Sequence, residues 1–455
     1  MAQFFKATRK KAETKPQKLV INVDVMDHHG NGICLQHKPI VVVAGGFTGE
    51  RYEVLVTSQN TKVWHAKILK VLNANTEART TPFCPYVNDC GGCSHQDFKA
   101  EALLSAKQER LTTYVDKNLS QFGSQTAQWE PAIRSDITST SNAYRRRARL
   151  AIDARNPKSI KIGFRQNQSN NVVDIPQCLV LSKGLQAFYP ALVSCLKGLD
   201  SIAAVGHITL TEGADERQVC LHLTKNLSQA SLTSLIAFAE AQKVSVLTLD
   251  KVRGLSCLYP HESEQVSISI RDDERAVLQV KPNDFVQVNG AVNSQMLQKA
   301  RQWLSLNKNE TLVDLFSGTG NFSLALAPEC KRVLGFEGLP ALVQQARNNA
   351  QLNHIDNCEF EVADLSEDDA IKRLTLPKNA VFIIDPSRDG AHTVMQNIAK
   401  LAPTKIVYVS CNPTSFVRDL QALPKGYMIS KMCALDMFPF TKHIEMMAMI
   451  EHVGT

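Results

Sequence analysis

The sequence predicts a multidomain α/β protein with an N-terminal small β-barrel, an α+β middle domain and a C-terminal doubly wound, Rossmann-like domain. Three observations predict this class. Short strand-like segments separated by glycines fill residues 13–72, a cysteine group and alternating segments mark residues 73–284, and strands alternate with helices over residues 285–455. Short strands with glycine turns are typical of small barrels, whereas repeated βαβ units form mostly parallel sheets.

Composition limits the class of protein further. At 455 residues the chain can hold two or three domains, and 44% hydrophobic and 21% charged residues are ordinary for a globular protein. Residues 1–20 lack the apolar stretch of a secretory signal, and Ile40–Ala44 is far too short to span a membrane. We therefore expect a cytoplasmic protein, in whose reducing compartment clustered cysteines bind metal or do chemistry more often than they form disulfides, although seven of the 12 cysteines have no spacing that indicates a role. We also expect a monomer.

The N-terminal part begins with a basic tail, residues 1–12, whose positive charge continues to Lys18. Such a tail either binds nucleic-acid phosphates or is a solvated, disordered segment, and composition favours neither. Strands of the barrel are expected at Lys18–Met26, Ile40–Val43, Tyr52–Ser58 and Thr61–Val71. Glycine turns and basic ends suggest an oligonucleotide-binding barrel, although spacing alone does not separate this from other small barrels.

Four cysteines suggest a metal centre in the middle domain. Cys84, Cys90 and Cys93 have the spacing C-x5-C-x2-C, and Cys178 follows far downstream. Zinc favours paired C-x2-C or cysteine–histidine sets, so one pair with two single cysteines fits a four-thiolate iron–sulfur cluster better. Zinc and scattered buried thiols are the alternatives, in that order.

An arginine cluster follows a helix expected from Asp97 to Asn118. The run Tyr144–Leu150 contains four arginines and continues into alternating, strand-like sequence. Phosphate-backbone binding needs such a concentration of positive charge, whereas a solvated face is the usual fate of a charge run. We favour nucleic-acid binding because the run leads into a strand rather than an acidic helix.

The C-terminal part alternates strands with helices. Strands are predicted at Leu312–Phe316, Val333–Phe336, Phe360–Val362, Val381–Ile384, Ile406–Val409, Tyr427–Leu435 and Ile444–Ile450, with helical stretches at 340–352 and 391–401. Open sheets of this kind bind ligands outside the carboxyl ends of their strands.

The first three of these strand ends carry groups suited to a nucleoside cofactor. Glycines in Asp314–Asn321 let the backbone approach a ligand closely, Glu337 can accept both ribose hydroxyls, and Asp364 can accept an adenine amino group. We interpret them as an S-adenosylmethionine site. Dinucleotide binding is the alternative, weakened by an incomplete glycine pattern and by the lack of a hydride-transfer partner.

Two later strand ends carry reactive groups. Asp385 follows Val381–Ile384, and Cys411 follows an apolar run that ends at Ser410. A lone cysteine is usually a small buried hydrophobe, but beside an acid and a cofactor loop it suggests a nucleophile. Glu445 precedes an apolar run, where a carboxylate is costly without a task, and a salt bridge to Lys442 explains it equally well.

Taken together, these residues resemble the RNA uracil-5 methyltransferases over nearly the whole chain. The resemblance rests on Cys84 with Cys90–Cys93, Tyr144–Leu150, Gly163–Arg165, Asp284–Asn289, Asp314–Phe322, Asp385–Arg388, Ser410–Pro413 and Asp436–Glu445. It is greatest for the branch that methylates uracil 1939 of 23S rRNA, in which the N-terminal barrel is a TRAM domain. Departures from the family's usual residues are Ser387, Phe440, Asp364 and, within the barrel, Arg51.

The resemblance implies a role for each site residue. Cys411 would be the nucleophile and Glu445 the base of an S-adenosylmethionine-dependent C5 methylation. The cofactor or the target base would contact Gln287, Phe316, Asn321, Glu337, Asp364 and Asp385, and a 4Fe-4S cluster would bind Cys84, Cys90, Cys93 and Cys178.

The expected chemistry requires these groups because uracil C5 is too weak a nucleophile to attack a methyl sulfonium. Addition of a thiolate to C6 makes C5 an enolate carbon, after which a base removes the C5 proton. The expected partner is 23S rRNA. Alternatives are a uridine elsewhere in rRNA or in tRNA, and a noncatalytic iron–sulfur RNA-binding protein. The N-terminal barrel argues against the tRNA branch, which typically lacks both the barrel and the cluster.

Overall fold

The computed structural model describes residues 17–123, 127–136, 142–167, 169–259 and 266–454. The chain forms two compact units, one of residues 1–81 and 97–110, the other of residues 82–96 and 111–455. The basic tail predicted for residues 1–12 lies outside the described residues. Among the helices that are described, none combines the length and the apolar character needed to cross a bilayer.

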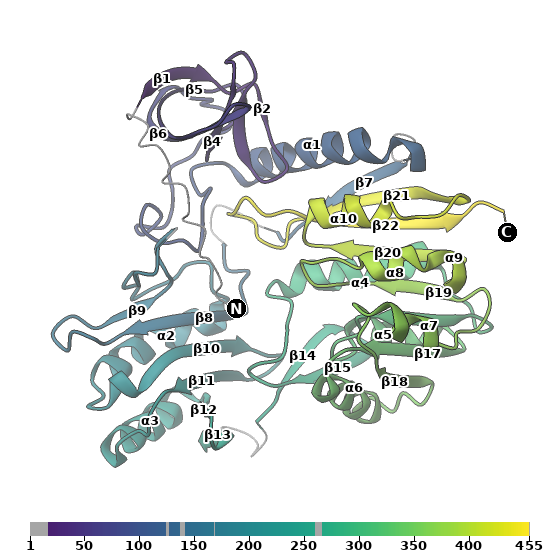
Figure 1. Ribbon diagram of the computed structural model, residues 1–455. Helices are drawn as coiled ribbons and strands as arrows, with labels where there is room; N and C mark the ends of the chain where they lie inside the picture. The colour runs from purple at the N-terminus through teal and green to yellow at the C-terminus, as the bar shows by residue number, and fades with distance from the viewer. Residues whose placement is uncertain (1–16, 124–126, 137–141, 168, 260–265, 455) are drawn as a thin grey trace, which may run out of the picture. The chain divides into compact units, whose positions relative to one another are not determined.

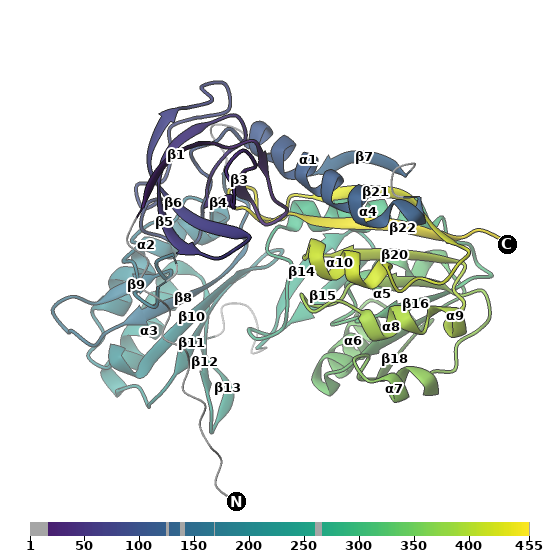
Figure 2. The same ribbon diagram turned by 45° about the horizontal axis from the view of Figure 1, so that its top comes forward.

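The first unit is a curled six-stranded sheet with strand order β1-β5-β6-β4-β3-β2. Its strands are β1 (Lys18–Asn22), β2 (Val25–Met26), β3 (Asn31–Cys34), β4 (Ile40–Ala44), β5 (Arg51–Gln59) and β6 (Val63–Asn73). The two ends of this order, β1 and β2, are consecutive in the chain, so the sheet curls around its core (Figure 2). Val41, Val43 and Tyr52 are fully buried in that core. The strands predicted at Ile40–Val43, Tyr52–Ser58 and Thr61–Val71 are present with small differences in their bounds. The segment Lys18–Met26, predicted as one strand, forms the two strands β1 and β2, and the short, glycine-containing β3 was not predicted.

The second unit contains a six-stranded sheet, β13-β12-β11-β10-β8-β9, with α2 and α3 packed on one face (Figure 1). Leu150 and Ile208 point toward these helices, where Phe188 and Leu192 of α2 cover them. The elements are β8 (Arg147–Asp153), β9 (Lys161–Gly163), α2 (Lys183–Lys197), β10 (Val205–Glu212), β11 (Arg217–Leu223), α3 (Gln229–Gln242), β12 (Ser245–Asp250) and β13 (Gly254–Tyr259). Helix α1 (Ala100–Leu119), of which residues 100–110 belong to the first unit, precedes them in the chain. The hairpin β14 (Ile268–Asp273) and β15 (Ala276–Val280) follows.

The same unit contains an eight-stranded sheet, β18-β17-β16-β19-β20-β22-β21-β7. Its strands are β7 (Gln128–Ile133), β16 (Thr311–Leu315), β17 (Arg332–Glu337), β18 (Cys358–Val362), β19 (Val381–Ile384), β20 (Lys405–Ser410), β21 (Tyr427–Leu435) and β22 (Glu445–His452). Within this sheet β22 alone runs antiparallel to its neighbours, as the described pairings show. The doubly wound sheet is therefore as predicted, but β7 comes from the segment expected to belong wholly to the middle domain.

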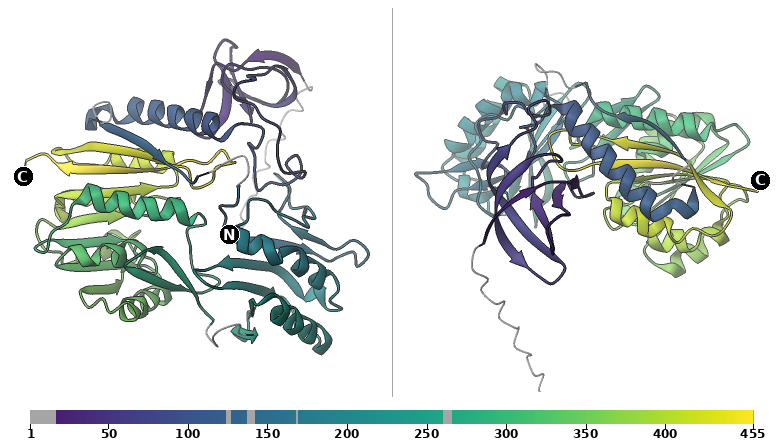
Figure 3. Two further views of the ribbon diagram at one scale, coloured as in Figure 1. Left: turned by 180° about the vertical axis from the view of Figure 1, so that it is seen from behind. Right: turned by 90° about the horizontal axis from the view of Figure 1, so that it is seen from above.

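Helices cover both faces of this sheet (Figure 3). Val407 and Val409 of β20 pack with Met296 of α4 on one face. On the other face the ring of Tyr408 lies 5.5 Å from that of Phe416 in α10, edge to face. The helices are α4 (Gly290–Leu304), α5 (Asn321–Leu326), α6 (Pro340–Leu352), α7 (Asp368–Arg373), α8 (His392–Gln396), α9 (Ile398–Leu401) and α10 (Pro413–Leu420). Strands buried on both faces place their polar residues at their ends, which positions the site.

Candidate active site

The loop after β16 turns sharply beneath a free space. Phe316 has a φ of 70°, a left-handed conformation that is uncommon outside glycine, and its amide and that of Ser317 donate to Phe336 O at 2.9 and 3.0 Å. Gly318 also has a positive φ, of 56°, and a Cβ there would meet no atom within 4 Å. This glycine thus leaves the backbone open to a ligand, as the sequence predicted.

Glu337, at the end of β17, lies beside this loop. Its carboxylate accepts hydrogen bonds from Gly318 N at 3.2 Å and from Leu339 N at 3.0 Å. Asp314 beneath the loop is buried and accepts from the Ser323 hydroxyl at 2.5 Å. Burial, with a smaller contribution from the charge of Glu337, raises the pKa of Asp314 to about 6. Two carboxylates therefore flank the backbone position that a nucleoside would approach.

Three other predicted cofactor residues have hydrogen-bond partners of their own. The Asn321 side chain exchanges two hydrogen bonds with Asn293 of α4, at 3.0 and 3.1 Å. Asp364, after β18, is exposed and accepts from the amide and hydroxyl of Ser366 at 3.0 and 2.6 Å. Gln287 is half-buried, and its carbonyl accepts from Arg146 Nε at 2.8 Å.

Cys411 and Glu445 lie at adjacent strand ends. In the antiparallel pair β20–β22 the last registered partners are Ser410 and Met446, so Cys411 and Glu445 are the residues immediately beyond them. Glu445 is buried, Cys411 is half-buried, and Lys442 is exposed. The pairing brings together a thiol and a carboxylate that are 34 positions apart in the printed sequence.

The electrostatics of this group are dominated by burial. Burial first, then the charge of Glu445, raises the pKa of Asp385 to about 8, and burial raises the pKa of Glu445 to about 7. Burial and the charge of Glu445 raise the pKa of the Cys411 thiol to about 11. Arg388 acts in the opposite direction on the pKa of both Cys411 and Glu445. Perturbed groups of complementary function at one place are typical of an active site.

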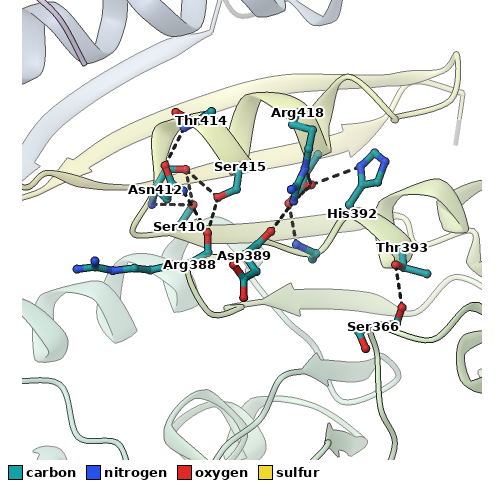
Figure 4. Close-up of polar contacts among 12 residues, drawn as sticks. Ser366, Arg388, Asp389, His392, Thr393, Ser410, Asn412, Thr414, Ser415 and Arg418 are labelled. Atoms are coloured by element: carbon teal, nitrogen blue, oxygen red, sulfur yellow. Dashed lines mark hydrogen bonds and ion pairs between the residues drawn. The ribbon is translucent and has the colours of Figure 1, made fainter. Parts of the chain in front are cut away.

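A hydrogen-bond network fixes the loop that carries Asp385 and Arg388. Asn412 caps α10 by accepting from Thr414 N at 3.1 Å, and its amide donates to Arg388 O at 3.1 Å. The Ser415 hydroxyl donates to the same carbonyl at 3.1 Å, while the Arg388 side chain extends away from these contacts (Figure 4). The loop after β19 is thus held against the start of α10, beside Cys411.

The four predicted metal cysteines line one cavity. Cys84, Cys90, Cys93 and Cys178 share it with Phe83, Phe164 and Val180. Burial, followed by contributions that include the neighbouring thiols, raises the pKa of Cys93 to about 12 and that of Cys178 to about 11. Among the described residues, however, no three His, Cys, Asp or Glu side chains are arranged to hold a single metal ion.

Comparison with known proteins identifies the family. The family described as tRNA (Uracil-5-)-methyltransferase matches residues 101–453. The chain belongs to the uracil-5-methyltransferase family. A Shewanella halifaxensis protein named 23S rRNA (uracil(1939)-C(5))-methyltransferase RlmD is 39% identical over 453 residues, 99% of each chain. An Aeromonas salmonicida protein of the same name is 36% identical over 99% of this chain and 100% of its own.

A solved structure supports the methyltransferase fold. The Pyrococcus abyssi tRNA (uracil-54, C5)-methyltransferase, in complex with S-adenosyl-L-homocysteine, matches 95% of this chain and 99% of its own, with a TM-score of 0.70 and 23% identity. A tRNA enzyme therefore has the fold of nearly this whole chain. The expectation that an N-terminal barrel argues against the tRNA branch does not hold against this coverage.

The arginine cluster of this methyltransferase differs from expectation. Arg146 forms a two-pronged ion pair with Asp272, 2.5 Å for each contact, and Arg147 donates to Pro282 O. Of the four arginines expected to bind RNA, these two instead hold the segment that leads to Gln287. Arg149 is exposed. A charge run cannot reveal such internal partners because Asp272 is more than a hundred residues away.

Sequence reasoning also missed residues that shape the methyltransferase site. Asp419 is fully buried and accepts from Tyr408 Oη and from Ala391 N, each at 2.7 Å. No local pattern marks it. Asn412 could have been found, because asparagine before proline is a common start of a helix.

Proposed function

We propose that this chain methylates C5 of a uridine in 23S rRNA, at the site equivalent to uracil 1939, with S-adenosylmethionine as methyl donor. The proposal is carried by the placement of Cys411 and Glu445 immediately beyond the Ser410–Met446 pair. Relatives 36% to 39% identical over essentially the full length carry the name of the 23S rRNA enzyme. The nucleophile and base assignments rest on the chemistry of the site.

Cys411 would start the reaction as its thiolate. The sulfur attacks uracil C6, a C6–S bond forms, and the π electrons move toward O4 so that C5 becomes nucleophilic. The thiol is a weak acid in the ligand-free protein, with its pKa raised to about 11 by burial and by Glu445. Arg388 favours the thiolate, and so would the positive sulfonium of the donor.

Asp385 is suited to hold the pyrimidine edge. Its pKa is raised to about 8 by burial and by Glu445, so at neutral pH it retains a proton. A protonated carboxyl can donate to O4 as negative charge develops there. Gln287 would supply a further polar contact to the base.

Glu445 would finish the reaction. C5 takes the methyl group as the methyl–sulfur bond of the sulfonium breaks and S-adenosylhomocysteine leaves. The carboxylate then removes the C5 proton, the C5–C6 double bond re-forms, and the Cys411 sulfur leaves as thiolate. Its pKa of about 7, raised by burial, suits a base that works near neutral pH. The buried position also keeps water from competing for the reactive adduct.

The methyl donor would occupy the loop after β16. Glu337 would exchange its two backbone partners for the ribose hydroxyls, and Gly318 would leave room for the donor. Phe316, Asn321 and Asp364 would supply the further contacts. The S-adenosyl-L-homocysteine bound to the Pyrococcus enzyme supports this class of ligand.

The cysteine cavity would hold a 4Fe-4S cluster. A single tetrahedral ion would draw its four sulfurs to within about 4 Å of one another. A cluster binds each thiolate through a different iron, so its four sulfurs stand farther apart around a shared cavity. The apolar lining and the four thiols fit that donor set. Methyl transfer from a sulfonium is redox-neutral, so the cluster would serve structure rather than electron transfer.

The remaining assignments extend the proposal. Residues 13–72, which include most of the curled sheet, would act as a TRAM-like RNA-binding domain, residues 73–284 as the iron–sulfur domain and residues 285–455 as the methyltransferase domain. The enzyme would work as a cytoplasmic monomer. Target bases must leave their stack to reach such a site, which is easiest in a loop or single strand.

The experiment compares Cys411→Ala and Glu445→Gln on unmodified 23S rRNA and tRNA transcripts. Cys411→Ala should give neither product nor covalent adduct, whereas Glu445→Gln should trap a methylated RNA–protein adduct. Methylation of tRNA alone would reassign the substrate. Unchanged cellular 5-methyluridine with both variants would make the chain a noncatalytic RNA-binding protein.

A further inference from the structure

The loop between β21 and β22, residues 436–444, carries Glu445 at its base. Leu435 and Glu445 are registered partners, so the two strands close the loop at this pair. Farther along the loop, Phe440 O accepts hydrogen bonds from Ser94 N at 3.0 Å and from His95 N at 3.1 Å. Lys442 N donates in return to the Ser94 hydroxyl at 3.2 Å. Ser94 and His95 come directly after Cys93, so the segment that carries Cys84, Cys90 and Cys93 is hydrogen-bonded to this loop. We call residues 83–95 the cysteine segment.

Side-chain packing reinforces the same contact. The Phe440 side chain is buried, and its ring lies 5.0 Å from that of Phe83, edge to face. It belongs to a small cluster with Tyr144 and Val180, against which Cys93 and Cys178 pack. Two of the four thiols therefore contact the cluster that contains the tip of the loop. Any rearrangement of those thiols bears on Phe440.

We propose that Phe440 and Ser94 are positioning residues for proton removal, through which the cysteine segment holds Glu445 in place. The inference rests on the role of Glu445 proposed above. An irregular loop of this length has many conformations when nothing restrains it, and a base displaced by about 1 Å can lose on the order of a hundredfold in rate. The pairing of Leu435 with Glu445 fixes the base of the loop. The hydrogen bonds from Ser94 N and His95 N to Phe440 O fix its tip.

The contacts of Phe440 also indicate a role for the four cysteines in the position of the Glu445 loop, although methyl transfer itself requires no metal centre. The hydrophobic group of Tyr144, Val180 and Phe440 contains a residue of the Glu445 loop and contacts two of the thiols, those of Cys93 and Cys178. An iron–sulfur cluster bound by those thiols would restrict the motion of residues 83–95 and, through them, of the loop that carries Glu445. Loss of the iron–sulfur cluster would then slow proton removal from C5 before it slows the attack of Cys411.

The test uses full-length Phe440→Ala with a 23S rRNA transcript and S-adenosylmethionine, followed by denaturing separation of covalent complexes. We expect methyl transfer into the adduct to change little, while product release slows by about ten- to hundredfold and adduct accumulates. Ser94→Ala, which leaves the buried ring in place, should show a smaller accumulation. Phe440→Leu should retain most of the release rate.

Amide hydrogen exchange supplies a readout independent of turnover. The amides of Ser94, His95 and Lys442 should exchange faster in Phe440→Ala than in the unchanged protein. Their acceptors are Phe440 O and the Ser94 hydroxyl, and the buried Phe440 ring holds these partners together. Phe238→Ala is the matched control, since it removes a buried phenyl ring from the α3 layer with no contact to the loop. It should leave both the exchange of these amides and the adduct fraction unchanged.

The outcomes separate this inference from the proposed function. Equal slowing of methyl transfer and release, without adduct, would overturn the positioning role. If Phe440→Ala does not fold, Ser94→Ala and Phe440→Leu decide, and the absence of extra adduct in both overturns it as well. If Glu445→Gln itself traps no adduct, the assignment of Glu445 as the base is wrong, and this result is distinct from a failure of the positioning role of Phe440 and Ser94.

Discussion

The hydroxyl of Tyr408 donates a 2.7 Å hydrogen bond to the buried carboxylate of Asp419, which ties β20 to α10 on either side of Cys411. The same carboxylate accepts from Ala391 N at 2.7 Å and from Arg418, at 2.9 and 2.7 Å. One acid therefore joins the strand before the thiol, the helix after it, and the loop that carries Asp385. The geometry of the site depends on a residue that touches no substrate.

Asp419→Asn should destabilise the fold and slow the reaction together. An amide cannot satisfy three kinds of donor, and breaking such a buried set costs about 2–3 kcal/mol. Denaturant unfolding measures the loss. Asp369→Asn, an exposed acid of α7, is the control and should change the unfolding free energy by less than about 0.5 kcal/mol. Equal unfolding midpoints for the two variants would contradict the role of Asp419.

Arg388→Met should move the pH dependence of product release upward. Glu445 must be ionised to take the C5 proton, so release should rise as pH increases through about 7, its raised pKa. Arg388 holds that pKa down, so removing its charge should shift the acid limb to higher pH. Single-turnover release rates across about pH 5 to 9 would show it. Arg388→Lys keeps the positive charge and should release product with the pH dependence of the unchanged protein. If the pH dependence of release in Arg388→Met is not shifted, Arg388 does not control the pKa of Glu445.

Glu337→Gln should weaken binding of the methyl donor. The carboxylate accepts from Gly318 N and Leu339 N in the ligand-free protein, and ribose hydroxyls would take the place of those donors. Hydrogen bonds to a charged group contribute about 1.5–3 kcal/mol, which is roughly a ten- to hundredfold change in Kd. Calorimetry with S-adenosylhomocysteine measures it. Glu361→Gln, an exposed acid on the adjacent strand β18, should bind as the unchanged protein does.

Cys93→Ser should prevent binding of the proposed iron–sulfur cluster and leave the other cysteines unchanged. Protein purified without oxygen should be brown and contain about four iron and four sulfide per chain, and the variant should be colourless. Cys195→Ser, in α2 and outside the cysteine cavity, is the control and should stay brown. Colourless unchanged protein with one zinc per chain would replace the cluster by a zinc site.

Local sequence determined much of this protein. The apolar runs Val381–Ile384 and Tyr427–Leu435 are strands with the bounds that their sequences predicted. Cys411 and Asp385 could be placed at strand ends because a buried parallel strand stops where its apolar run stops. Gly318 could be predicted to let a ligand approach the backbone closely, because the conformational freedom of glycine is a property of the residue itself.

Only the tertiary structure decided which distant residues meet. Three contacts join segments that are more than a hundred residues apart. They are the pairing of β7 with β21, the ion pair of Arg146 with Asp272, and the hydrogen bond from Ser94 N to Phe440 O. Periodicity and composition act over a few turns or one strand, whereas these contacts follow from how whole layers pack. The order of the sheet, rather than the spacing of the residues, placed Cys411 beside Glu445.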